Sequence, residues 1–490
     1  MGDLKGPHTF LSLVHFMSQN EKISFQRFEF ESLCIDHNDD VPIFRQIENQ
    51  IRVAIWEGRL KPRERLPSSR LLARSLGVAR NTVVNAYEQL TLEGFVNSKK
   101  GSGTRVDDRY PQQMAPSSLK QTDVIGQSTL APITLSSRYS ELSSLELSVP
   151  NGEESTARPF RAHTPACNEF PASVWAQLAV KALNQSPGLW MEKNSPSGYF
   201  PLREAIASYL CLARGLRVTP EQVMVTAGAQ QAVELLAKVL IEPDDVVVFE
   251  DPGYTHAAKA FQMAGANIIN VPVDEQGLDI EYLQKTVKTA KLVYVTPANQ
   301  FPMGVTLPLS RRSALLEWAN QSGAIIVEDD YNGEYLYKGR PLTTLHAMAP
   351  DNHVVYVGSF SKLLFPALRL GYMIVPEQLL RPLETVRWLL DRHSPSLEQV
   401  VLSEFINQGY FARHLRRMRT LYALRQQALV DAAKKYWSNI MTVPPLDGGL
   451  HLVGYLLDGV EEINVLKAAE LANLELMSTS IFCSRLTLNN

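Results

Sequence analysis

The chain has few cysteines, no long apolar run and no strong net charge, and each shortage excludes a class of protein. Its four cysteines lie far apart and form no C-x-x-C pair, so neither a disulfide framework nor a zinc site is indicated. No apolar run approaches the roughly 20 residues of a membrane-spanning helix, and no cleavable leader is evident. We therefore expect a cytoplasmic protein without metal or membrane contact.

The charge balance limits how the chain meets nucleic acid. With 48 basic and 51 acidic residues, the formal charge of -3 argues against a surface coated in DNA or RNA. Any DNA contact must come from a local patch. The 490 residues predict about three units of roughly 150 residues, or one large α/β domain.

Composition and periodicity divide the chain into four segments. Residues 1–40 form an arm without clear periodicity, 41–106 a small domain, 107–158 a linker rich in Ser, Pro, Thr and Gln, and 159–490 a large domain. Helical patterns alternate with short apolar runs in the large domain, which predicts βαβ units and a mainly parallel sheet. The predicted strands are Val223–Val225, Val246–Phe249, Ile268–Val271, Leu292–Val295, Ile325–Val327 and Val354–Val357.

The small domain reads as three helices followed by a hairpin. A first helix within residues 42–60 ends near Gly58, a second is capped by a serine and stops at Gly77, and a third starts at Arg80. Helix, short glycine-containing turn and helix is the spacing of a helix-turn-helix, which presents its second helix to a major groove. The following strand-turn-strand forms a wing with lysines near its tip.

The residue types in this segment suit DNA contacts. Arginine forks bind guanine, asparagine amides read adenine, threonine binds phosphate or a thymine methyl group, and lysines of the wing face phosphate. Taken singly, each such residue is more often ordinary solvated surface. The candidate DNA contacts are Ser69, Arg70, Arg80, Asn81, Thr82, Asn85, Gly101 and Gly103.

In the large domain, chemistry-bearing residues follow the predicted strands. A loop with two hydroxyls and a lysine follows the predicted strand Val354–Val357, and an arginine comes shortly after this loop. A glycine turn follows the predicted strand Val223–Val225 and leads into a helix. Hydroxyls, guanidinium groups and helix N-termini are natural phosphate ligands, and a lysine can capture an aldehyde. These residues are Ser359, Ser361, Lys362, Arg369, Ala229 and Gln230.

Two further strands end in aromatic and acidic residues. Tyr254 follows one and is a candidate for stacking on a planar ring. Three acids, residues 328–330, and then Tyr331 end the other, and one carboxylate there would pair with a ring nitrogen. Acids just past a strand are also common as caps or solvated turn residues.

The motifs resemble known families. PIFRQI, GRLKP, LPSSRLLA, GVARNTVVNAYEQL, EGF and GSGT resemble the winged helix-turn-helix of GntR-type bacterial regulators. The large domain looks like fold-type I aminotransferases, and its motif sequences are similar to those of the MocR subfamily of GntR regulators. These motifs are TAGAQQA, EDPGY, TPANQFPMG, EDDYNGEY and GSFSKLLFPALRLGY. The implied fold is α/β, with an N-terminal winged helix-turn-helix joined by a linker to a fold-type I aminotransferase-like domain.

This resemblance implies a cofactor, pyridoxal phosphate (PLP), held on Lys362. It implies Asp329 at the pyridine nitrogen, Tyr331 at the phenolic oxygen and Tyr254 on the ring, with Asn299 in the cofactor-proximal loop. It also implies a homodimer with PLP near the subunit interface.

The sequence departs from the family pattern at three places. Ala79 stands where Ser or Thr usually caps the recognition helix, and Lys193 stands where a tyrosine usually reaches the partner's phosphate. The C-terminal residues do not provide the usual arginine that clasps a ligand carboxylate. Arg485 is one candidate to replace this arginine. The simpler explanation of its absence is a truncated or frame-shifted C-terminus.

Three functions are compatible with these motifs. A transcription regulator would bind double-stranded DNA and sense PLP or a small amino compound. An active aminotransferase with a DNA-binding appendage would use Lys362, Asp329 and Tyr254, although the missing clamp argues against efficient turnover. A scaffold without PLP leaves the motifs unexplained, so we favour the regulator.

Overall fold

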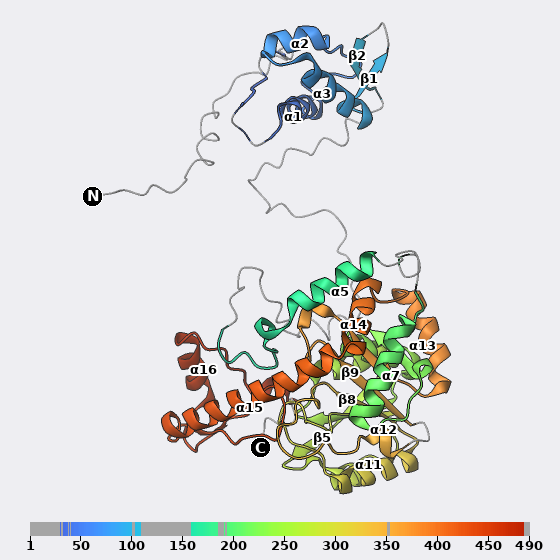
Figure 1. The fold of residues 1–490 in the computed structure, drawn as a ribbon, viewed down its shortest axis with the longest axis vertical. Coiled ribbons are helices and arrows are strands. Elements are labelled where there is room, and N and C mark those ends of the chain that lie inside the picture. The colour runs from blue at the N-terminus through green and yellow to red at the C-terminus, as the bar shows by residue number, and fades with distance from the viewer. Residues whose placement is uncertain are drawn as a thin grey trace, which may run out of the picture. The chain divides into compact units, whose positions relative to one another are not determined.

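The computed structural model describes residues 30, 33–37, 39, 41–99, 103–108, 158–184, 191, 194–349 and 353–484. The chain forms two compact units, Met1–Ile133 and Thr134–Asn490, which Figure 1 shows as blue and as green-to-red ribbons. Their division falls inside the segment predicted as a linker. Residues 1–29 of the predicted arm and residues 109–157 of the predicted linker lie outside the described residues.

The smaller unit packs three helices against a hairpin. Its elements are α1 (Ile43–Trp56), α2 (Ser69–Leu76), α3 (Arg80–Leu92), β1 (Val96–Lys99) and β2 (Gly103–Val106). The apolar faces of the helices meet in one core that includes Ile51, Leu72 and Val83. Strands β1 and β2 pair antiparallel, so the predicted wing is confirmed.

Local capping explains where α2 begins and ends. The Ser68 side chain accepts a hydrogen bond from the Leu71 N–H, which satisfies one of the free donors at the helix start. Gly77 follows the last turn with a φ of 66°, a left-handed conformation that favours glycine. The predicted serine cap and glycine stop are therefore both confirmed.

The end of the predicted N-terminal arm packs on the smaller unit. Leu33 is buried in the helical core, and the Gln50 side chain on α1 bonds both the N–H and the C=O of Cys34. The sequence pattern before residue 40 has no periodicity, so this contact was not predicted. The described part of the arm thus extends the hydrophobic core of the smaller unit.

The larger unit is built on a mixed sheet, which has eight strands in the described residues, ordered β3-β10-β9-β8-β7-β4-β5-β6. Neighbours from β9 through β8, β7 and β4 to β5 are parallel, whereas β10 runs antiparallel to both β3 and β9. The strands are β3 (Val223–Thr226), β4 (Val246–Asp251), β5 (Asn267–Asp274), β6 (Gly277–Leu278), β7 (Leu292–Val295), β8 (Ile325–Asp330), β9 (Val354–Ser359) and β10 (Gly371–Ile374). The six predicted strands are all present, and the mainly parallel order is confirmed.

Helices cover both faces of this sheet. Strand residues alternate between two cores, as in β3, where Val225 faces one cluster and Met224 the other. The long helix α15 (Tyr410–Tyr436) crosses the unit in Figure 1, and a small C-terminal part follows it. The remaining helices and strands are α5 (Ala172–Asn184), α7 (Phe200–Arg214), α8 (Ala229–Leu240), α9 (Thr255–Ala264), α10 (Ile280–Thr286), α11 (Leu309–Ser322), α12 (Leu345–Met348), α13 (Glu377–Leu390), α14 (Ser396–Asn407), α16 (Glu462–Leu471), β11 (Met441–Thr442) and β12 (Tyr455–Leu456).

Candidate functional site

The candidate DNA-contacting side chains gather at the starts of α2 and α3. Arg70 on α2 and Arg80, Asn81 and Asn85 on α3 are exposed, while the opposite face of α3 is buried in the core. The Arg80 Nε donates to the Ser69 Oγ at 3.4 Å, which joins the two helix starts. The structure thus brings five of the predicted DNA residues onto adjoining helix ends.

The other predicted DNA residues lie in the first turn of α3 and in the wing. Thr82 is half-buried on α3. Gly103 has a φ of 83°, a left-handed backbone that favours glycine, and the Arg65 guanidinium lies 3.0 Å from where a side chain would begin. Gly101 and Lys100 lie outside the described residues.

The loops predicted to hold the cofactor leave one edge of the large sheet. Strands β4, β7, β8 and β9 are parallel, and β3 has the same direction because β10 runs antiparallel to both β3 and β9. The segments that follow these strands therefore meet at a single edge. In open α/β sheets this edge is where ligands bind.

The residues predicted to bind phosphate flank the start of β10. Gly371 pairs with the last residues of both β3 and β9, so the turn after β3 and the loop after β9 flank it. An Arg369 Nη donates to the Ala227 carbonyl at 2.9 Å, and Gly228, with a φ of 99°, leaves space for that guanidinium. Because Gly228 precedes α8, the free N–H groups of Ala229 and its neighbours open beside Arg369.

The predicted hydroxyl ligands, Ser359 and Ser361, lie at the end of β9 and in the loop after it. The Ser361 N–H donates to the Ser359 Oγ at 3.3 Å, while the buried Ser361 Oγ has no hydrogen-bond partner among the described residues. On the α8 side, the Tyr254 hydroxyl lies 3.3 Å from the Gln230 Oε1. The predicted phosphate ligands and the predicted ring-stacking tyrosine are therefore adjacent.

Lys362 lies half-buried in the loop after β9. Its Nζ donates to the His163 carbonyl at 3.0 Å. Burial lowers the pKa of Lys362, and the nearby Asp329 carboxylate partly opposes that shift. A lysine with a lowered pKa holds more of its neutral, nucleophilic form at neutral pH.

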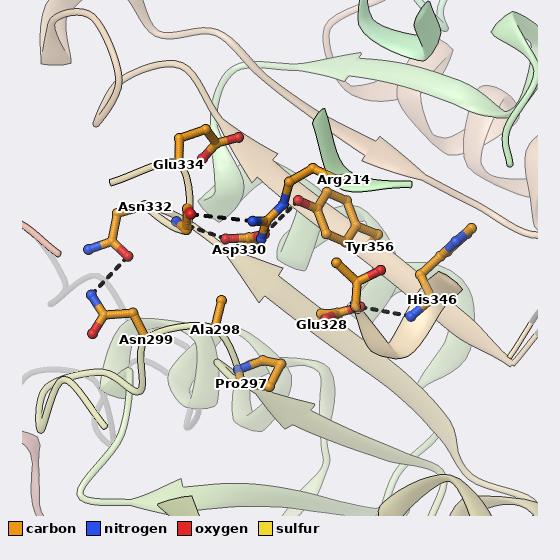
Figure 2. A network of polar contacts seen from close by, with 12 residues as sticks. Arg214, Pro297, Ala298, Asn299, Glu328, Asp330, Asn332, Glu334, His346 and Tyr356 are labelled. Atoms are coloured by element: carbon orange, nitrogen blue, oxygen red, sulfur yellow. Dashed lines mark hydrogen bonds and ion pairs between the residues drawn. The ribbon is translucent and has the colours of Figure 1, made fainter. Parts of the chain in front are cut away.

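The three consecutive acids at the end of β8 have different partners. Asp330 pairs with Arg214 and accepts from the Tyr356 hydroxyl at 2.7 Å, and Glu328 accepts from two backbone N–H groups at the start of α12. Figure 2 shows both acids and their partners around β8. Because strand side chains alternate, Asp329 points to the opposite face.

Asp329 is the acid of this run with an unused oxygen. The Tyr294 hydroxyl on β7 bonds its Oδ2, while the buried Oδ1 has no partner in the described part of the chain. Burial raises the Asp329 pKa to about 6, although the Tyr294 hydrogen bond and the charge of Lys362 oppose the shift. Asp329 therefore has one oxygen available to a cationic N–H group.

Aromatic rings surround this carboxylate. The Tyr254 ring lies 6.5 Å from Tyr294 and 5.7 Å from Phe301, and Phe301 lies 5.9 Å from Tyr331. The buried Tyr331 hydroxyl has no hydrogen-bond partner within the residues described. Asn299 donates to the Asn332 Oδ1 at 2.9 Å, as Figure 2 shows. The site thus combines apolar walls with a few convergent polar atoms.

Comparison with known proteins agrees with this geometry. Residues 44–106 match the model of bacterial regulatory proteins of the gntR family, and residues 169–450 match aminotransferase class I and II. The chain is 35% identical to the probable rhizopine catabolism regulatory protein MocR of Rhizobium meliloti over 89% of this chain and 86% of that protein. The chain belongs to the MocR subfamily of GntR-type regulators. It is therefore a DNA-binding transcription regulator with an aminotransferase-like fold.

Two further comparisons place this MocR-type regulator among its relatives. It is 32% identical to the pyridoxine biosynthesis transcriptional regulator PdxR of Corynebacterium glutamicum over 86% of this chain and 85% of that protein. The larger unit is similar to the kynurenine aminotransferase of Pyrococcus horikoshii, with a TM-score of 0.63 and 28% identity over 72% of this chain and 87% of that one. The predicted fold class is confirmed.

Sequence reasoning missed several residues of the site in this MocR-type regulator. Tyr294 contacts Asp329, and His163 and His451 lie near Lys362. Phe301 contacts His163 and Tyr254. Tyr294 had one signal, a hydroxyl inside an otherwise apolar strand. His163 and His451 come from segments far apart in the sequence, and neither lies in a motif that marks a site.

The last described residues of the chain lie beside the site. The Phe482 carbonyl accepts from the Gly253 N–H at 3.0 Å, the Ser484 hydroxyl donates to Asp251 at 2.6 Å, and the Phe482 ring lies 4.8 Å from Phe301. Arg485 and Lys193, the two substitutes considered from the sequence, lie outside the described residues.

Neither a candidate metal site nor a candidate membrane span is found in the described residues. Their His, Cys, Asp and Glu side chains form no group of three that could hold a metal ion. None of the described helices combines the length and apolar character that crossing a membrane requires.

Proposed function

We propose that this regulator binds PLP at Lys362 and that PLP, or a small amino compound bound beside it, changes how the chain binds DNA. The observation that carries the proposal is a set of buried polar atoms that lack partners among the described residues. They are the Asp329 Oδ1, the Tyr331 hydroxyl and the Ser361 Oγ. Leaving such atoms unpaired typically costs about 1–3 kcal/mol each, so a site that retains three indicates a ligand with matching groups.

PLP has the groups that these residues require. Asp329 would hold a proton at the pyridine nitrogen, and Tyr331 would bond the phenolic oxygen. Ser359, Ser361 and Arg369, with the N-terminus of α8, would bind the phosphate, and Tyr254 would cover the ring. When bound, PLP supplies an aldehyde that captures primary amines. The residues present therefore fit the cofactor.

The proposal extends to how the regulator acts. A homodimer would present two winged helix-turn-helix units to two DNA half-sites, as dimeric regulators of this kind require. A ligand changes DNA affinity only if it binds two arrangements of the chain unequally. The effector is thus PLP itself or a small amine that binds at the same site.

The test of PLP binding is spectroscopic. Purified protein titrated with PLP should acquire the visible absorbance of lysine-bound PLP, and Lys362→Ala should lose it. Lys338→Ala removes an exposed lysine of the same unit and should leave the absorbance intact. Persistence of the band in Lys362→Ala would exclude that lysine as the attachment site.

Transamination is a second candidate, favoured by a specific observation. Lys362, Asp329 and Tyr254 would supply the lysine, the acid and the ring cover of a first half-reaction, and the fold is similar to solved aminotransferases at 27–29% identity. Incubation of the PLP-loaded protein with amino acids and a keto acid tests it. Formation of the matching keto acid and amino acid would establish an enzyme, and their absence would leave only the regulator.

A further inference from the structure

Two histidine rings lie next to Lys362, and neither belongs to the predicted PLP site. The rings of His163 and His451 are 4.4 Å apart, and His163 also contacts Phe301 at 4.8 Å. The His163 carbonyl accepts the hydrogen bond from the Lys362 Nζ. A molecule held at Lys362 would therefore meet both imidazoles.

The hydrogen bonds of His451 determine which of its nitrogens is an acceptor. Its Nε2 lies 2.7 Å from the Pro302 carbonyl oxygen, which can only accept, so Nε2 carries the proton. Burial lowers the pKa of His451, with the charge of Lys362 acting in the same sense, which keeps the ring neutral. The Nδ1 is then a lone-pair acceptor, and it is buried without a partner in the described part of the chain.

His163 also has a ring nitrogen without a partner among the described residues, and its backbone is strained. Its Nδ1 is likewise buried and has no partner among the residues described. The residue has a φ of 60°, a left-handed conformation that is unfavourable for a residue with a side chain. Backbone strain of this kind is concentrated at functional sites. In this conformation the His163 carbonyl bonds Lys362 and the His163 ring contacts the His451 ring.

We propose that His163 and His451 form a subsite for the hydroxyl group of an amino compound, so that the effector is an amino alcohol and not an amino acid. A hydroxyl donates to the His451 Nδ1 and can also accept from His163, whereas a carboxylate has no proton to donate and is repelled by the Nδ1 lone pair. The arginines around β8 are committed elsewhere, Arg214 to Asp330 and Arg419 to the Glu334 carbonyl.

This inference rests on the proposed PLP site and is tested on the full-length, PLP-loaded protein. Calorimetric titration compares alaninol with alanine, a pair in which a hydroxymethyl group replaces the carboxylate. We expect alaninol to bind at least about tenfold more tightly, because the buried acceptor selects a donor. His451→Phe, which keeps a ring and removes both nitrogens, should abolish the preference, and His451→Asn, which restores an acceptor, should recover part of it.

Controls separate a lost subsite from a lost fold. His353→Phe changes an exposed histidine before β9, at the opposite end of that strand from Lys362, and should keep the preference. Retained PLP absorbance shows that a variant still folds around the cofactor. Equal binding of both amines, tighter binding of alanine, no binding of alaninol, or a preference that survives in His451→Phe would overturn the inference. Loss of PLP absorbance in the unmodified protein would instead overturn the proposed function.

Discussion

At the residue scale, three adjacent carboxylates at the end of β8 have three different environments. Glu328 accepts from the start of α12, Asp330 pairs with Arg214, and Asp329 keeps a buried oxygen unpaired among the described residues. Strand alternation separates Asp329 from its neighbours, and burial then sets its pKa. Asp329 is therefore the acid suited to a ring nitrogen.

The pKa of Asp329 predicts how stability changes with pH in protein prepared without PLP. Burial raises it to about 6 from an ordinary 3.8, so ionisation costs stability as pH rises through this range. Asp329→Asn removes this cost and should raise the free energy of unfolding near neutral pH by on the order of 1–3 kcal/mol, while weakening PLP binding. Chemical denaturation at acidic and neutral pH, together with PLP titration, measures both effects.

A second acid serves as the comparison. Burial raises the pKa of Glu250 to about 7. Ionisation of Glu250 therefore also lowers the stability of the protein as pH rises, at slightly higher pH than ionisation of Asp329. Glu250→Gln should therefore change stability like Asp329→Asn, but without removing a PLP ligand. If Asp329→Asn bound PLP as tightly as the unmodified protein, its assignment to the pyridine nitrogen would be wrong.

At the element scale, α3 begins without a polar cap. Ala79 occupies the N-cap position with extended dihedrals, and its methyl side chain cannot accept from the free N–H groups of the first turn. Ala79→Ser should stabilise the start of α3 by about 1 kcal/mol. Slower amide hydrogen exchange in the first turn of α3 would show it. Ala79→Val, which adds bulk and no acceptor, should give no such protection.

The contact between Arg80 and Ser69 places a guanidinium at the joint of α2 and α3. If Arg80 reads a guanine, Arg80→Ala should cost about 1–3 kcal/mol of operator binding and relax specificity at one base. Fluorescence anisotropy with operator and unrelated DNA checks this. Arg217→Ala, an exposed arginine of the larger unit, is the charge-matched control. A uniform loss across all DNA sequences would assign Arg80 to phosphate instead.

Sequence predicted most elements because their signals are local. Apolar runs identified the strands, but the run at Ile325–Val327 continues in the structure through the acids to Asp330. Polarity suggested a strand end there, whereas partners from distant segments allow the acids to stay in the sheet. Likewise, nothing local indicates that β10 inserts antiparallel between β3 and β9, because that order is a tertiary property.

The site was predictable to a similar degree. Lys362, Asp329, Tyr254 and Tyr331 lie in short motifs, and the fold brings them to one sheet edge. His163 was not predictable, since its contact with Lys362 spans 199 residues. Side chains that recognise a particular ligand come from such long-range contacts, which no local pattern records.

At the scale of the whole molecule, the chain joins a DNA-binding winged helix-turn-helix unit to an aminotransferase-like unit. We propose that ligand occupancy of the larger unit changes the DNA affinity of the smaller unit, and that this change depends on Lys362. Coupling between sites is a free energy, typically about 1–3 kcal/mol, so it appears as a five- to 150-fold change in affinity.

The most direct measurement is the binding of DNA from upstream of the protein's own gene, followed by fluorescence anisotropy while PLP is added at fixed salt. PLP should change the operator Kd of the unmodified protein severalfold or more, and should leave that of Lys362→Ala unchanged. Lys338→Ala should respond like the unmodified protein. An operator Kd that is insensitive to PLP, or that responds equally in Lys362→Ala, would contradict the account.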